Sequence, residues 1–87
     1  MKFKITYENT AEPVEVLAIP LARRQLEEAH KRPLLELMGE GFGAWAEELV
    51  HRTLVIRAGE SRSLEEWLRT VDAIELQVAA DDDPGEG

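Results

Sequence analysis

Cysteine is absent from this 87-residue sequence, and aromatic residues make up only 6% of it. Without cysteine the chain has no disulfide, no thiolate metal site and no cysteine nucleophile, which fits a reducing compartment. No apolar run is long enough for a signal peptide or a membrane-spanning helix, so we expect no membrane contact. A small domain with few large side chains has a thin core, so a partner protein or a second copy is a candidate source of added stability.

Basic residues are also scarce: 10 Lys and Arg stand against 18 Asp and Glu, which gives a net charge of −8 at pH 7. Such a charge repels phosphate backbones, so we expect no nucleic-acid binding. Half of the net charge lies in the final residues, which also contain Pro and Gly and little to bury: Asp81, Asp82, Asp83 and Glu86. Residues 79–87 are therefore predicted to be a disordered acidic tail, and residues 1–78 a single small domain.

The N-terminal part of the domain alternates with the period of a strand. Phe3, Ile5 and Tyr7 point one way between polar neighbours over residues 2–8. A turn at residues 9–13 leads to a second alternating segment from Val14 to Ala18. These two segments predict a β-hairpin, which is marginal alone and needs other elements to cover its apolar face.

The rest of the domain is predicted to be mostly helical. Pro20 suits the first turn of a helix that runs to about Lys31, and residues 34–38 form a short helical turn. The spacing of apolar residues predicts the longest helix over residues 42–58, with Gly59 ending it.

A capping signal marks one more helix near the C-terminus. Ser63 is followed three residues later by Glu66, which is the pattern of a capping box. Beyond this short helix the period changes to two, with Ile74, Leu76 and Val78 as the apolar positions. This segment is either a third strand on the hairpin or an extended segment that orders on a partner. The fold class is therefore α+β: an N-terminal hairpin, three or four helices, and the alternative of a short C-terminal strand.

Residues with catalytic potential are few and scattered. His30 and His51 lack the three or four convergent ligands of a zinc site, although Glu47 stands one helical turn before His51. No nucleophile elbow surrounds a serine or threonine, and the paired glutamates are adjacent on helices and so point apart. We therefore predict no catalytic residue, no metal and no cofactor, and a protein that is not an enzyme.

Protein binding is the remaining class of function. Trp45 and Trp67 are interpreted first as core anchors, with a place beside a binding groove as the alternative, because Trp is enriched at interface hot spots. The predicted partner-binding residues are large apolar side chains of the helical part: Leu34, Leu37, Phe42, Trp45, Leu49 and Trp67.

Residues 58–75 read AGESRSLEEWLRTVDAIE and resemble the C-terminal half of tail assembly chaperones from long-tailed bacteriophages of actinobacteria. The order of elements is similar over nearly the whole chain. It comprises a hairpin, a helix introduced by Pro20, a Trp- and Ala-containing helix around Trp45 that ends in basic residues, a short Glu-Glu-Trp-Leu helix and an acidic tail.

The resemblance implies a chaperone that binds and solubilises the tape measure protein in the host cytoplasm and helps recruit the major tail protein. Such a chaperone is absent from the mature virion. The acidic ending would suit the short form of a gene that also makes a longer product by programmed frameshift. Two alternatives stay open: a minor virion tail or connector protein, and a small acidic DNA mimic that inhibits a host nucleic-acid enzyme.

Overall fold

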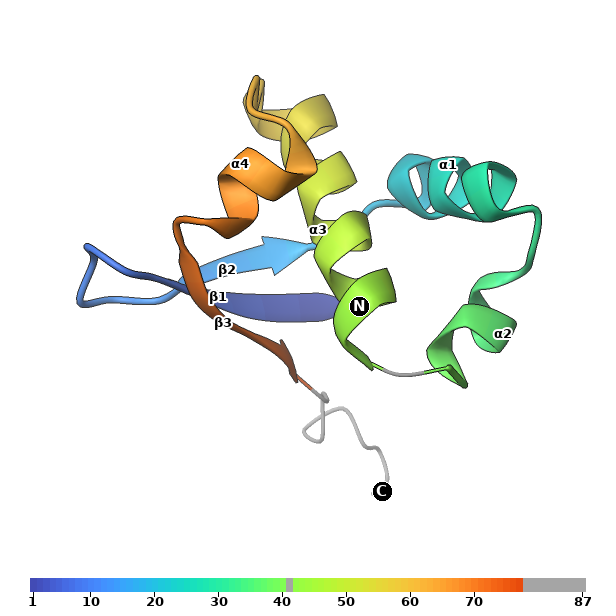
Figure 1. The fold of residues 1–87 in the computed structure, drawn as a ribbon, viewed down its shortest axis with the longest axis horizontal. Coiled ribbons are helices and arrows are strands. Elements are labelled where there is room, and N and C mark those ends of the chain that lie inside the picture. The colour runs from blue at the N-terminus through green and yellow to red at the C-terminus, as the bar shows by residue number, and fades with distance from the viewer. Residues whose placement is uncertain (41, 78–87) are drawn as a thin grey trace, which may run out of the picture.

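The computed structural model describes residues 1–40 and 42–77, with the side chain of Phe42 left out. Two strands, β1 (Lys2–Tyr7) and β2 (Val14–Leu17), come first (Figure 1). Four helices and a last strand follow in chain order: α1 (Pro20–His30), α2 (Leu34–Met38), α3 (Phe42–Ala58), α4 (Leu64–Leu68) and β3 (Val71–Gln77). The predicted α+β class is confirmed, while the predicted tail over residues 79–87 lies outside the described residues.

The three strands form one antiparallel sheet in the order β2-β1-β3. In the central strand, Phe3 pairs with Val16 and Leu76. Directly paired residues share a face of the sheet, so these apolar side chains lie together on one side. The segment after α4 is therefore a strand, and it begins at Val71, earlier than the period-two pattern indicated.

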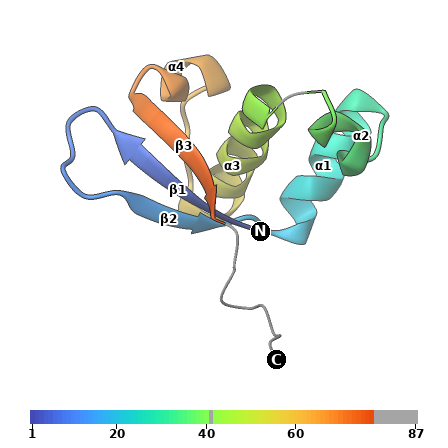
Figure 2. The same ribbon diagram turned by 90° about the horizontal axis from the view of Figure 1, so that it is seen from below.

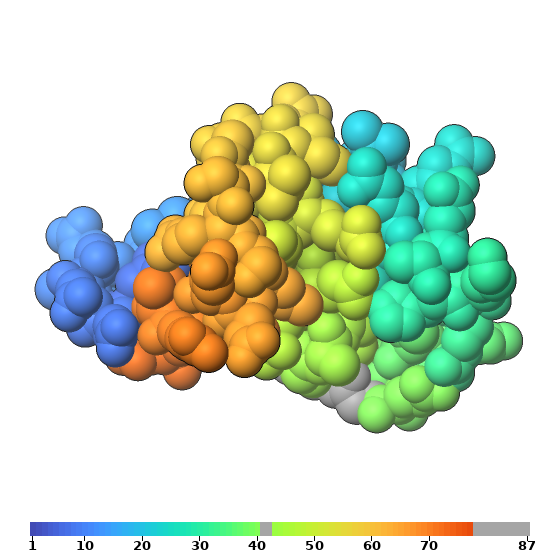
Figure 3. Space-filling model, turned by 45° about the horizontal axis from the view of Figure 1, so that its top comes forward, coloured from blue at the N-terminus to red at the C-terminus, as the bar shows by residue number. Residues whose placement is uncertain are grey.

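The helices are arranged in two layers on one side of this sheet. Figure 2 shows α3 between the sheet and α1, and α3 and α4 both contact the strands. The helices α1 and α2 pack on the far side of α3. The space-filling view likewise places α3 between α4 and the hairpin on one side and α1 and α2 on the other (Figure 3). The opposite face of the sheet carries polar residues, with Lys2 paired to Glu15 at 3.7 Å.

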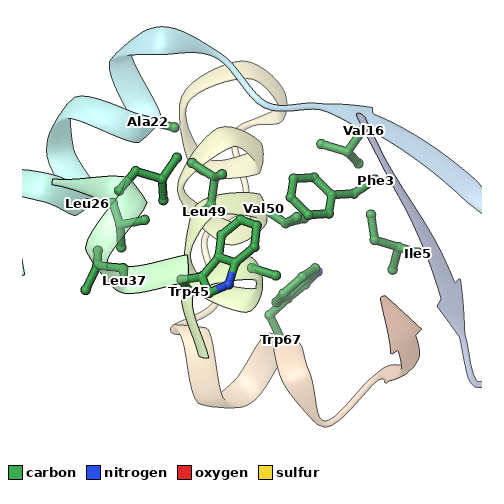
Figure 4. Close-up of a cluster of buried hydrophobic side chains, with 12 residues drawn as sticks. Phe3, Ile5, Val16, Ala22, Leu26, Leu37, Trp45, Leu49, Val50 and Trp67 are labelled. Carbon is green, nitrogen blue, oxygen red and sulfur yellow. The ribbon is translucent and has the colours of Figure 1, made fainter. Parts of the chain in front are cut away.

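The hydrophobic core lies around α3 (Figure 4). Trp67 is fully buried, and its Nε1 donates a hydrogen bond to the hydroxyl of Tyr7 at 3.2 Å. Trp45 is buried too, and its ring meets the ring of Phe3 edge-on with 6.1 Å between centroids. Both tryptophans are thus core anchors, as the first interpretation had it.

The predicted helix ends are confirmed by backbone geometry. Gly59 follows α3 with a φ of 70°, a conformation that favours glycine. At α4, the backbone N–H of Glu66 donates to Ser63 Oγ at 3.2 Å, and the N–H of Ser63 donates to Glu66 Oε1 at 3.1 Å. This is the expected capping box. None of the described helices is both long and apolar enough to cross a membrane.

Candidate protein-binding surface

Five of the six predicted partner-binding residues belong to the core. None of their side chains exposes more than 8% of its surface: Leu34, Leu37, Trp45, Leu49 and Trp67. The sixth, Phe42, begins α3, and its side chain lies outside the described part of the structure. A partner contact through these residues stays a prediction.

The structure nevertheless separates these residues into three places. Leu34 and Leu49 line one hollow, and Leu37 and Trp45 line another. Trp67 points from α4 into the core beside the sheet (Figure 4). The predicted set therefore does not form one continuous surface.

Leu34 and Leu49 contribute to a groove where β2 leads into α1. We call it the corner groove; it has a volume of about 350 Å³ and is lined by Met1, Ala18, Ile19, Pro20, Arg23, Leu34 and Leu49. Six of these seven side chains are apolar, and Arg23 carries the charge. An apolar groove with one convergent polar group is the common form of a binding site.

Local sequence explains the shape of this corner. The backbone N–H of Ala18 donates to the carbonyl of Met1 at 2.9 Å, which extends the pairing of β1 and β2 by one step. Ile19 stays extended as the N-cap, with φ −104° and ψ 154°, and Pro20 starts the helix. The chain therefore turns from strand to helix within three residues and leaves their apolar side chains at the turn.

Exposed apolar residues stand on either side of this turn in the chain. Leu17 is 62% exposed and Leu21 is 50% exposed, and Met1 is also exposed. Single exposed apolar residues are common on proteins, but here two of them flank an apolar groove, which makes this corner a candidate interaction surface. The sequence does hold a signal for it: Leu17 to Leu21 is an unbroken apolar run, longer than the alternation of a strand requires.

Leu37 and Trp45 line a smaller hollow of about 150 Å³ between α1, α2 and α3. Charged pairs border it: His30 Nε2 lies 2.7 Å from Glu48 Oε1, and Arg32 Nη1 donates to Glu40 Oε1 at 3.0 Å. Burial alone raises the pKa of Glu48, but hydrogen bonds from His30 and Arg52 outweigh it, so its pKa is lowered. The first contact joins the end of α1 to α3, and the second joins the segments just before and just after α2.

The second histidine has a structural contact. His51 Nε2 lies 2.8 Å from the carbonyl oxygen of Arg62, and its ring centroid lies 5.6 Å from that of Trp67. It therefore contacts the loop before α4 instead of the Glu47 carboxylate considered from the sequence. Among the residues that the structure describes, no group of three or more His, Cys, Asp or Glu side chains is placed to hold a metal ion.

Comparison with known proteins identified no relative of this chain. No protein family model, no curated protein and no solved structure matches this chain.

Proposed function

We propose that this protein is a tail assembly chaperone of a long-tailed bacteriophage, which binds the tape measure protein, keeps it soluble and helps recruit the major tail protein. The resemblance of residues 58–75 and the order of elements are the basis for naming this client. The single observation that carries the binding function is the corner groove with its flanking exposed residues, Leu17 and Leu21. It is an apolar surface without a covering element in the described chain.

The charge of the chain suits this role. A protein that exposes apolar surface risks association with itself, and a net charge far from zero opposes such association. The net charge is −8, and none of the carboxylates in the described part of the chain lines the corner groove. The acidic surface therefore keeps the complex soluble while the groove makes the contact.

Co-expression with the tape measure protein of the same genome tests the proposal. We expect the tape measure protein to be soluble and to co-purify with the wild-type chain, and to precipitate without it. Ile19→Asp should reduce the co-purified tape measure protein severalfold, because it puts a charge into the groove. Aspartate is favoured at an N-cap, so α1 is expected to keep its start.

A second variant and a control separate loss of binding from loss of fold. Leu21→Glu changes an exposed residue in the first turn of α1, where an acid suits the helix dipole. Val55→Glu changes a similarly exposed apolar residue of α3 that does not line the groove. If Leu21→Glu, Ile19→Asp and Val55→Glu all retain the tape measure protein equally, the groove is not the contact. If the wild-type chain leaves that protein insoluble, the chaperone function is wrong.

The chaperone is also expected to be absent from finished particles. Mass spectrometry of purified virions checks this, and stoichiometric recovery of the chain would favour the alternative of a minor tail or connector protein.

A further inference from the structure

The corner groove differs in charge from the other hollows of the described chain. Four other hollows are each lined by at least one carboxylate, among them Glu27, Glu47 and Glu48. The corner groove has none, and its charged side chain is the arginine at position 23. In a chain with a net charge of −8, this is a local reversal of sign.

Arg23 is exposed and makes no ion pair or side-chain hydrogen bond with the described residues. Four other arginines are each paired with a glutamate: Arg32, Arg52, Arg62 and Arg69. The acid one turn after Arg23 is Glu27, but its Oε2 accepts a hydrogen bond from the backbone N–H of Leu34 at 2.7 Å. Arginine before glutamate is also the weaker order for such a helical pair. The guanidinium is therefore available beside an apolar surface.

We infer that the corner groove binds partner segments in which large apolar side chains adjoin a carboxylate, and that Arg23 selects for the carboxylate. Arginine suits this task because its planar group can donate two parallel hydrogen bonds to a carboxylate. A docked apolar segment would also exclude water from Arg23 and strengthen the pair. This inference rests on the proposed binding function and names the chemistry of the segments that the groove takes.

The charge selectivity can be measured with peptides tiled along the tape measure protein of the same genome. Peptides retained by the wild-type chain are expected to combine apolar residues with Asp or Glu. For each retained peptide, replacing that acid by its amide should weaken binding about three- to tenfold, in the range of the net contribution of one ordinary hydrogen bond. The ratio should shrink as salt is raised, because salt screens partly exposed pairs.

A charge-reversal variant of Arg23 is the decisive experiment. Arg23→Glu should bind the acidic peptides at least tenfold more weakly and should regain affinity for peptides with Lys in place of the acid. Arg24→Glu is the matched control: it changes the same net charge at the next residue, which lines a different hollow. If both variants weaken binding equally, the effect is one of overall charge and the inference fails.

The remaining outcomes separate this inference from the chaperone function. If the retained peptides show no preference for Asp or Glu, and if Arg23→Glu binds them as tightly as wild type, the proposed selectivity is wrong. The chaperone function would then still stand. A chain ending at Gln77 that binds the peptides tenfold more tightly would assign the groove to the chain's own acidic residues 81–83. A wild-type dimer that Ile19→Asp dissociates would assign it to a second copy. Either result overturns the inference of a partner segment.

Discussion

The side of α3 that faces the sheet packs against buried aromatic and aliphatic side chains, whereas the side that faces α1 and α2 packs against aliphatic side chains bordered by charged residues. Figure 4 shows Val50 directed toward Phe3, and Leu49 directed toward Ala22 and Leu26. The rings of Phe3 and Trp45 pack edge-on toward the sheet, while the His30–Glu48 hydrogen bond and the Arg32–Glu40 ion pair border the other side. The corner groove lies where the ends of β1 and β2 meet α1. The groove proposed to bind a partner thus lies away from the aromatic packing of the sheet side.

Among the substitutions considered, Trp67→Ala should lower the free energy of unfolding most. It removes the largest fully buried side chain and its hydrogen bond to Tyr7. The expected loss is about 3–5 kcal/mol in the free energy of unfolding, a large share of the total for a small domain. Urea unfolding followed by circular dichroism measures it. A loss smaller than that of Leu26→Ala would contradict the ranking of the two sides.

Leu26→Ala is the matching change on the helical side, at an equally buried position. We expect a loss of about 2–4 kcal/mol. We also expect α1 and α2 amides to exchange hydrogen faster than those of β1, because the two helices pack on α3 and can open locally. Hydrogen exchange read by mass spectrometry checks this pattern. Equal acceleration in β1 would mean that both sides unfold as one unit.

The contacts of Glu48 with His30 of α1 and with Arg52 of α3 should contribute less than either core residue. Glu48→Gln is expected to cost on the order of 0.5 kcal/mol at pH 7, as partly exposed pairs do. The Glu48 pKa is lowered in the folded chain, so its stabilising effect is full above about pH 4.5 and is lost as the pH falls through the lowered value. Urea unfolding of wild type and Glu48→Gln at several pH values checks this: the difference between their free energies of unfolding should shrink as the pH falls below about 4.5.

Glu65→Gln provides the control for this pH dependence. It breaks the exposed pair of Glu65 with Arg69, in which the two charged atoms lie 3.4 Å apart within a single helix end. Its effect should be smaller, because both side chains are mostly in water. If Glu48→Gln and Glu65→Gln lower the free energy of unfolding equally, the contact of Glu48 with His30 of α1 adds no stability beyond that of an exposed pair.

Much of the fold was predictable because its signals are local. The alternation around Phe3 and Ile5, the proline that starts α1 and the capping box of Ser63 and Glu66 each depend on neighbouring residues. The state of residues 71–77 was not predictable, because a strand exists only by pairing with another, here β1 across some sixty residues of chain. Burial of Leu34 and Leu49 was ambiguous for the same reason: an apolar stripe can face a core or a partner.

The sequence by itself determined the hairpin, the helices, their order and the acidity, since periodicity, caps and composition act within a few residues. The tertiary structure decided which apolar residues remain outside. It buried Trp45 and Trp67 in the core, and it left Leu17 and Leu21 exposed on either side of the turn between β2 and α1. It also placed Arg23 beside an apolar groove that no carboxylate of the described residues lines. Such placement depends on how whole elements pack, because exposure is a property of the assembled surface.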